Sequence, residues 1–184
     1  MWPWREQAAA SRRQAVFWRY AESDRRLAAH MHRAASWPAV LAVLRAVSWL
    51  GDGPLWYAAI VVLPWLDWPG WKDCLLDMLL VGAANVALNV ALKHHVRRAR
   101  PFVDCPGIRA RARAIDRFSF PSGHVMHAVA FAIIIARHYP ELGVPLWLFV
   151  ALVAASRVVL GLHYPSDVLA GASLGAGVAL LLSL

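Results

Sequence analysis

The stretch Ser156-Arg157-Val158-Val159-Leu160-Gly161-Leu162-His163-Tyr164-Pro165-Ser166-Asp167 separates two long apolar runs of the chain. Polar side chains at the boundary between an apolar segment and water cost free energy to place, so in a membrane protein they indicate function. Moreover, His163 and Asp167 lie four residues apart. A carboxylate within reach of one imidazole nitrogen fixes the tautomer and makes the other nitrogen a better base or nucleophile.

Two further polar clusters occupy comparable positions upstream. Lys93, Arg100 and Pro101 close one apolar run, and the tetrapeptide 121–124, Pro-Ser-Gly-His, opens the next. In order, the chain reads Lys, six residues, Arg-Pro; then Pro-Ser-Gly-His; then Ser-Arg, five residues, His, three residues, Asp. This pattern resembles the three-part signature of the type 2 phosphatidate phosphatase superfamily. These are integral-membrane lipid phosphatases, and vanadium haloperoxidases are their soluble relatives. The resemblance spans residues 93–167 and includes every signature residue.

The resemblance implies a catalytic role for three residues. His163 would attack phosphorus and form a phosphohistidine, while Asp167 would orient its imidazole. His124 would protonate the leaving group and later activate water. Phosphoryl transfer requires such a nucleophile and acid, together with fixed positive charge around the phosphoryl oxygens.

The resemblance also implies phosphate ligands, and the chemistry of these residues agrees with it. They are Lys93, Arg100 and Arg157, together with the backbone of Ser122 and Gly123. Guanidinium groups match phosphate oxygens with paired donors, lysine acts as a point charge, and a helix N-terminus offers free N–H groups. The sequence contains no carboxylate cluster of the metal-ligand type. We therefore expect catalysis without a metal ion or other cofactor.

Composition favours a membrane protein. The chain has 184 residues, 60% of them hydrophobic, which exceeds the usual apolar share of soluble domains. Its net charge is +8, but only 16% of residues are charged, so a nucleic-acid partner is not expected. Cys74 and Cys105 have no metal-ligand spacing, and they are predicted to lie on opposite faces of the bilayer, unbonded. The arginine-rich N-terminal stretch lacks the apolar core of a cleavable signal peptide.

The apolar runs predict an all-α transmembrane bundle of five spans. The expected spans are residues 54–68, 74–92, 124–138, 144–161 and 167–184. Residues 1–33 and 36–50 are predicted to be interfacial helices, the second because 15 residues of helix cover only about 22 Å of a bilayer core of about 30 Å. If 36–50 crossed the membrane instead, the bundle would have six spans. We divide the chain into a basic, aromatic segment, 1–53, and a phosphatase core, 54–184, within a single domain.

Polar and small residues predict how these spans pack. Asp77, Asn85, Asn89 and Lys93 share one helix face and should face the bundle, where the two asparagines would form interhelical hydrogen bonds. Gly171 and Gly175 form a small-xxx-small face for close helix packing.

Alternating spans bring the end of 74–92, the start of 124–138 and the stretch 157–167 to the same side of the membrane. Residues 1–53 carry eight arginines, and 93–120 carry Lys93 and seven arginines, whereas the opposite loops carry only Lys72 and Arg137. Since basic residues of short loops stay cytoplasmic, the site should face the cytoplasm of a bacterial-type inner membrane.

The sequence therefore predicts a lipid phosphatase that acts on a phosphate monoester or diphosphate. Isoprenoid phosphates and diphosphates, phosphatidate and phosphatidylglycerophosphate-like lipids all remain open as substrates. Phosphotransfer to a second hydroxyl, a vanadate-dependent haloperoxidase and a non-catalytic scaffold are the alternatives. The apolar spans argue against the haloperoxidase, and the intact signature argues against the scaffold. The sequence does not indicate an oligomeric state.

Overall fold

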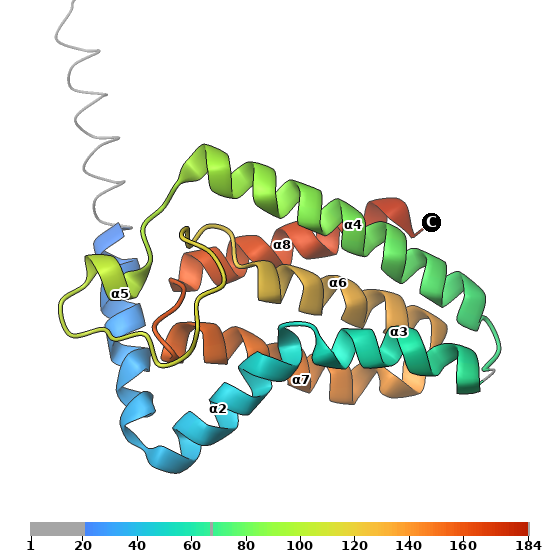
Figure 1. Cartoon of the computed structure of the whole chain (residues 1–184), viewed down its shortest axis with the longest axis horizontal. Coiled ribbons are helices and arrows are strands. Elements are labelled where there is room, and N and C mark those ends of the chain that lie inside the picture. The colour runs from blue at the N-terminus through green and yellow to red at the C-terminus, as the bar shows by residue number, and fades with distance from the viewer. Residues whose placement is uncertain (1–20, 67, 184) are drawn as a thin grey trace, which may run out of the picture.

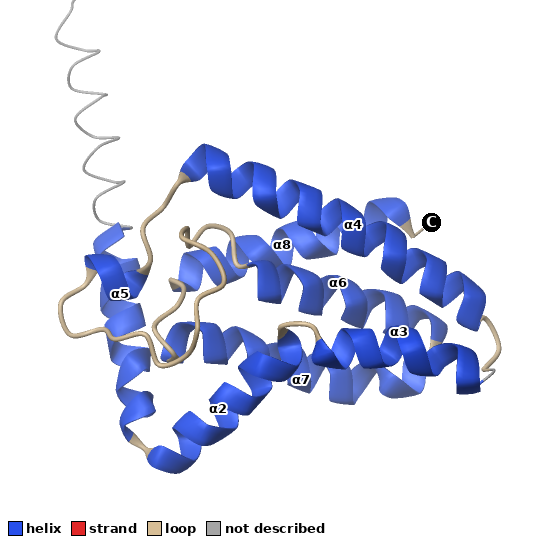
Figure 2. Cartoon of the chain, in the orientation of Figure 1, coloured by secondary structure: helices blue, strands red, loops and turns tan. Residues whose placement is uncertain are grey.

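The computed structural model describes residues 21–66 and 68–183, and within them all regular structure is helical (Figures 1 and 2). Residues 21–32 form an α-helix that continues into the 3₁₀-helix η1 (Arg33–Ser36). The other elements are α2 (Pro38–Gly51), α3 (Pro54–Leu66), α4 (Trp71–Val96), α5 (Pro101–Asp104), α6 (Gly123–His138), η2 (Pro140–Leu142), α7 (Gly143–Val159) and α8 (Pro165–Leu182). Each of the five predicted spans corresponds to one helix, namely α3, α4, α6, α7 and α8. The predicted all-α bundle is thus confirmed.

Helix α6 lies at the centre of the bundle, with α4, α7 and α8 running alongside it (Figure 1). Its sequence is apolar on all sides from Ala128 to Ala136, which is typical of a helix surrounded by protein. Accordingly, Val125, Met126, Ala128 and most of the following residues are buried. The amino end of α6 therefore has a fixed position among its neighbours, and this is the end that carries His124.

Two glycines of α8 allow it to pack closely on α6, as predicted. A methyl group at Gly171 would collide with the carbonyl oxygen of Ser122, and one at Gly175 with the carbonyl oxygen of Met126. Small residues of this kind let helix backbones approach where larger side chains would separate them. The contact ties the start of α8, which carries Asp167, to the start of α6.

Three helices are long and apolar enough to cross a membrane, namely those within 71–104, 140–159 and 165–182. The helix over Ala21–Ser36 and α2 make a bent pair, with 112° between them, that also passes this test when joined. The apolar helices α3 and α6 are shorter. Residues 21–36 run across one end of the bundle (Figure 1), in the orientation expected of an interfacial helix. The part of the predicted interfacial helix before residue 21 lies outside the described residues.

The predicted polar stripe of α4 faces the bundle. Asp77 contacts His138 of α6, with 3.1 Å between Oδ2 and Nε2, and Lys93 is buried at the other end of the helix. Asn89 donates to the carbonyl oxygen of Pro121 at 3.4 Å. The predicted hydrogen bond of Asn85 was wrong, because both polar atoms of its amide are buried without a hydrogen-bond partner. Cys74 and Cys105 are both free thiols, as predicted.

Candidate active site

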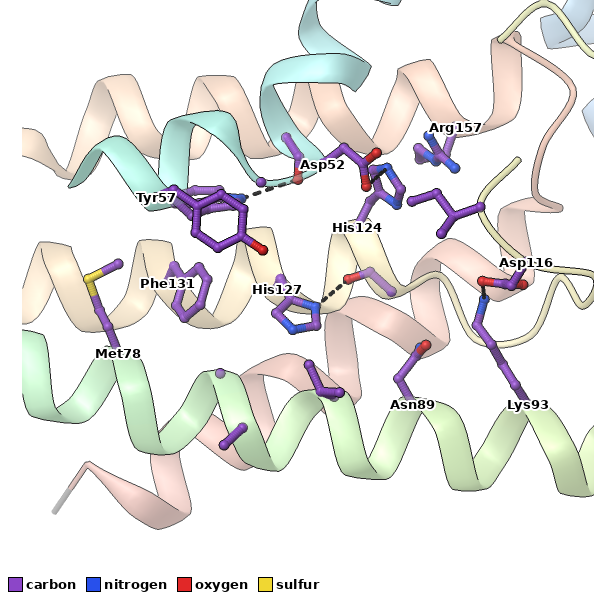
Figure 3. A pocket seen from close by; sticks show the side chains of 18 of the residues that line it. Asp52, Tyr57, Met78, Asn89, Lys93, Asp116, His124, His127, Phe131 and Arg157 are labelled. Carbon is purple, nitrogen blue, oxygen red and sulfur yellow. Dashed lines mark hydrogen bonds and ion pairs between the residues drawn. The ribbon is translucent and has the colours of Figure 1, made fainter. Parts of the chain in front are cut away.

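A cavity of about 370 Å³ lies among α3, α4, α6 and α7 and reaches the loops that follow α4 and α7 (Figure 3). Six of the eight predicted site residues line it, namely Lys93, Arg100, Gly123, His124, Arg157 and His163. Segments that are distant in sequence therefore meet at one end of the bundle, as the alternation of spans required. Ser122 and Asp167, the remaining two, lie outside the lining.

His163 is fully buried in the turn between α7 and α8. Its Nδ1 lies 2.7 Å from the carbonyl oxygen of Ser119. A carbonyl oxygen can only accept, so Nδ1 carries the hydrogen and Nε2 carries the lone pair. That Nε2 lies 3.3 Å from Nη1 of Arg100. Burial, together with the positive charges of Arg157, Arg100 and Lys93, lowers the pKa of His163 well below its ordinary value. The imidazole is thus neutral near pH 7 and can act as a nucleophile.

His124 lies in the first turn of α6 and has a carboxylate partner that the sequence analysis missed. Its Nε2 is 2.9 Å from Oδ1 of Asp52, in the turn between α2 and α3 (Figure 3). Because a carboxylate accepts, Nε2 carries a hydrogen and Nδ1 is the nitrogen left for proton transfer. The two site histidines are therefore held by different groups.

Lys93 and Arg100 share one counter-ion, Asp116, from the loop between α5 and α6. Lys93 Nζ lies 2.6 Å from Oδ2 of Asp116, and Arg100 Nη2 lies 2.9 Å from Oδ1. Arg100 also donates to the carbonyl oxygens of Leu162 and Asp116. Burial opposes it, but the hydrogen bond from Lys93 and the charges of Lys93 and Arg100 lower the pKa of the Asp116 carboxyl. Asp116 is thus a carboxylate bound by two of the predicted phosphate ligands.

Arg157 is the third cation of the site, and nearby carboxylates neutralise its charge only weakly. Its side chain is buried near the end of α7, and Nη1 donates to the hydroxyl oxygen of Ser48 at 2.6 Å. Its Nε is buried without a hydrogen-bond partner. A buried guanidinium with unused donors is suited to bind an anion that enters the cavity.

Asp167 lies close to His163, as the resemblance implied, but it forms no hydrogen bond with the imidazole in this structure. Its Oδ2 is 3.7 Å from Nδ1 of His163, too long for a hydrogen bond, and the carbonyl oxygen of Ser119 occupies that nitrogen instead. The carboxylate accepts from the backbone N–H of Tyr164 at 2.8 Å and from Nη1 of Arg98 at 2.7 Å. Asp167 therefore caps α8 and fixes the turn in which His163 lies.

A second ion pair extends this contact to the helix over residues 21–32. The other guanidinium nitrogen of Arg98 donates to Asp24 at 2.7 Å, and Asp24 also accepts from the backbone N–H and hydroxyl of Ser166. The guanidinium carbon lies 4.0 Å from the ring centre of Tyr164. This network binds the first turn of α8 to two separate segments of the chain.

The backbone of Ser122 is not available to a phosphate group in this structure. Its N–H donates to the carbonyl oxygen of Asp167 at 3.0 Å, and its hydroxyl is buried without a partner. Gly123, the first residue of α6, does line the cavity. The anion site expected at this helix end is therefore confined to residues after Ser122, because Ser122 joins α6 to α8.

With this geometry in place, the chain can be compared with known proteins. The sequence profile of the PAP2 superfamily matches residues 74–184. The chain belongs to the PAP2 superfamily. It is 34% identical over 145 residues to the decaprenylphosphoryl-5-phosphoribose phosphatase of Mycobacterium tuberculosis, and the match covers 77% of each chain.

Two solved structures of PAP2 proteins resemble the whole bundle. The transmembrane PAP2 type phosphatidylglycerolphosphate phosphatase from Bacillus subtilis has a TM-score of 0.66 and 29% identity, covering 85% of this chain and 82% of the other. LpxE of Aquifex aeolicus has a TM-score of 0.75 at 21% identity, covering 85% and 92%, which supports the fold alone. The protein is thus a PAP2-type lipid phosphatase and an integral membrane protein.

In this PAP2 protein the cavity has a polar and an apolar end. Lys93, Asp116, His124 and Arg157 lie at one end in Figure 3, and Met78 and Phe131 at the other. The apolar part lies between α3 and α4. Its lining residues Tyr57, Leu79 and Val86 are largely exposed on the outer surface, so the cavity opens sideways between these helices.

Several residues of the PAP2 site were not predicted. They are Ser48 and Asp52 near the end of α2, Arg98, Asp116 and Ser119. Arg98 is one of many arginines in its part of the sequence, and the Gly-Asp-Gly-Pro sequence at 51–54 is a turn pattern that does not by itself indicate a catalytic carboxylate. Asp116 is one of only two acids in residues 94–120, which are rich in arginine, and this isolation is the one signal that could have singled it out. A contact made by a backbone carbonyl, such as that of Ser119, cannot be predicted from residue type, because every residue has a backbone carbonyl.

Proposed function

We propose that this PAP2 protein removes a terminal phosphate from an isoprenoid lipid through a phosphohistidine intermediate on His163, without a metal ion. The observation that carries the proposal is that one cavity joins a cationic end, with two imidazoles, to an apolar end open between α3 and α4. The phosphate would bind to Lys93, Arg100 and Arg157, while the lipid tail would leave sideways into the bilayer.

The chemistry proceeds in two steps. The lone pair on Nε2 of His163 forms a bond to phosphorus as the bond to the leaving oxygen breaks, and His124 gives a proton to that oxygen. In the second step His124 takes a proton from water, whose oxygen bonds to phosphorus as the P–N bond breaks. The products are an alcohol and inorganic phosphate, and the three cations stabilise the charge on the phosphoryl oxygens throughout.

Isoprenoid lipids are favoured over glycerolipids by two observations. The Mycobacterium tuberculosis relative is named for a decaprenyl lipid, although the Bacillus subtilis structure is named for phosphatidylglycerolphosphate. The cavity also holds only about 370 Å³, which suits a single chain better than two acyl chains. A sugar or a second phosphate between the tail and the terminal phosphate is compatible with the polar end.

A substrate panel tests this proposal. The purified chain in detergent would be given prenyl phosphates, prenyl diphosphates, phosphatidate and phosphatidylglycerophosphate, with His163→Ala as the blank and with EDTA in a parallel series. We expect the highest kcat/KM for a prenyl substrate and no effect of EDTA. Highest activity on a glycerolipid would overturn the substrate assignment. Loss of activity in EDTA that Mg²⁺ restores would overturn the metal-free mechanism.

We also propose that the site faces the cytoplasm. The exposed arginines Arg26, Arg33, Arg109, Arg113 and Arg117 all lie in segments at the site end of the bundle, and basic residues of short loops remain cytoplasmic. In inside-out vesicles, a Cys105→Ser chain carrying Arg113→Cys should react with a membrane-impermeant maleimide. A chain carrying Glu141→Cys, in η2 at the other end, should not. The reverse labelling pattern would place the site outside.

A further inference from the structure

The last turn of α2 and the turn into α3, residues 48–54, form a corner that touches two signature residues. Asp52 contacts His124, and Ser48 contacts Arg157. The PAP2 sequence match begins only at residue 74, so this corner lies outside the part of the chain that carries the family signature. We infer that Asp52 is a positioning residue for proton transfer by His124, and that Ser48 positions Arg157. The inference rests on the proposed function, in which His124 is the acid.

The contact of Asp52 decides which nitrogen of His124 transfers the proton. The carboxylate holds Nε2–H at 2.9 Å, so Nδ1 gives a proton to the leaving oxygen in the first step and takes one from water in the second. A carboxylate in this arrangement fixes the tautomer and the ring orientation and stabilises the imidazolium. Asp52 lines the cavity itself and retains 38% exposure of its side chain.

Asp52 also supplies the charge that a protonated His124 requires. Arg157 of α7 and Lys93 of α4 act on His124 as positive charges, and His163 of the α7–α8 turn faces the same site. The other carboxylate that lines the cavity, Asp116, is bound to Lys93 and Arg100. Among the described residues, Asp52 is therefore the acid in contact with His124 that favours an imidazolium there.

Ser48 contacts the second signature residue, Arg157, from the last turn of α2. It lies four residues before Asp52, about one helical turn, and its buried hydroxyl oxygen accepts from Nη1 of Arg157. A neutral acceptor holds the guanidinium without neutralising its charge. Arg157 thus keeps a fixed direction and its full attraction for a phosphate group.

The corner is built to hold these two side chains in place. A methyl group at Gly51 would collide with Val153 of α7, and Gly53 has a positive φ of 143°, so glycine is required on both sides of Asp52. Trp56 donates from Nε1 to the carbonyl oxygen of Gly51 at 3.2 Å. Close packing against α7 therefore fixes where the Asp52 carboxylate lies.

The experiment compares two leaving groups. A prenyl phosphate releases an alcohol that needs a proton, whereas 4-nitrophenyl phosphate releases a phenolate that departs without one. Asp52→Asn should lower kcat/KM, which reports the steps up to loss of the leaving group, by about 10²–10⁴-fold on the prenyl phosphate, the range of general acid catalysis, and by less than about tenfold on the aryl phosphate. Asp52→Glu should restore a large part of the loss. Ser48→Ala should lower kcat on both substrates by the same factor, since Arg157 acts on the phosphoryl group.

Asp73→Asn is the matched control, an acid-to-amide change at an exposed position in the first turn of α4, far from the site. It should behave as the parent chain does. Equal losses on the two leaving groups in Asp52→Asn, or no loss on either, would overturn the positioning role. Binding of vanadate by the variants, followed by thermal shift, separates a folded protein from an unfolded one. If His163→Ala kept the parent turnover, the proposed function itself would fail, which is a distinct result.

Discussion

The surroundings of the two site histidines differ in a way that matches two different roles. His124 has a carboxylate at hydrogen-bond distance, whereas His163 has a backbone carbonyl there and its nearest carboxylate is 3.7 Å away. A carboxylate stabilises an imidazolium, which is the form an acid needs. A carbonyl oxygen fixes the tautomer with less stabilisation of the charged ring, which suits a nucleophile that must keep its lone pair. Both signature residues are histidines, and their partners in the structure differ in the way that the two implied roles require.

The largest effect is expected from removing the nucleophile. His163→Ala should lower turnover by at least about 10⁴-fold, since no phosphoenzyme can form, and loss of a nucleophile has effects of this order. Phosphate release would measure it, together with labelling by a ³²P substrate that is quenched in alkali, because the P–N bond of a phosphohistidine breaks in acid. The exposed His95→Ala at the end of α4 is the control, and it should keep parent activity. Labelled phosphoenzyme in His163→Ala would mean that another residue attacks phosphorus.

The contrast between the two histidines also shows which features of the site could be predicted from the sequence. Residue type, order and spacing located Lys93, Arg100, His124, Arg157 and His163, because alternating spans must bring helix ends together at one membrane face. The same reasoning assigned Asp167 to His163 from a four-residue spacing. The two side chains do lie near each other, at 3.7 Å, but the turn after α7 is not helical, so sequence spacing did not fix the distance, and a backbone carbonyl lies closer to Nδ1.

The residues outside the signature that contact the site could not be predicted from motifs, for a similar reason. The contacts of Asp52 with His124 and of Asp24 with Arg98 join residues that are more than 70 positions apart. They depend on the 112° bend between the helix over 21–36 and α2, and on the packing of α2 against α7. Neither is visible in periodicity or composition.

The next largest effect should come from Arg157, whose Nε has no hydrogen-bond partner in the structure. Arg157→Lys should lower kcat by about 10²–10³-fold, because lysine keeps the charge but loses the planar pair of donors. Steady-state kinetics on a prenyl phosphate would measure this, with the exposed loop variant Arg113→Lys as control. If Arg157→Lys retained more than a tenth of parent kcat, charge alone would be sufficient at this position.

A smaller and different effect is expected for Asp167. Asp167→Asn removes the charged partner of Arg98 and weakens the cap of α8, which should lower the free energy of unfolding by about 1.5–3 kcal/mol. Its loss of turnover per folded molecule should be smaller than that of Asp52→Asn. Thermal unfolding in detergent and kcat on a prenyl phosphate measure the two quantities. An unchanged melting temperature with a loss above 100-fold would instead support the His–Asp pair that the resemblance implied.

The smallest effect should come from Asp116, the carboxylate that binds Lys93 and Arg100 where phosphate oxygens would bind. A phosphate dianion and this carboxylate compete for the same donors, so Asp116→Asn should strengthen inhibition by inorganic phosphate by several-fold and lower KM. Product-inhibition kinetics would measure it, with Asp73→Asn as control. Weaker inhibition would mean that Asp116 holds the two cations in position for phosphate. In that case the carboxylates of Asp52 and Asp116 would have the same task, each fixing a group that meets the substrate.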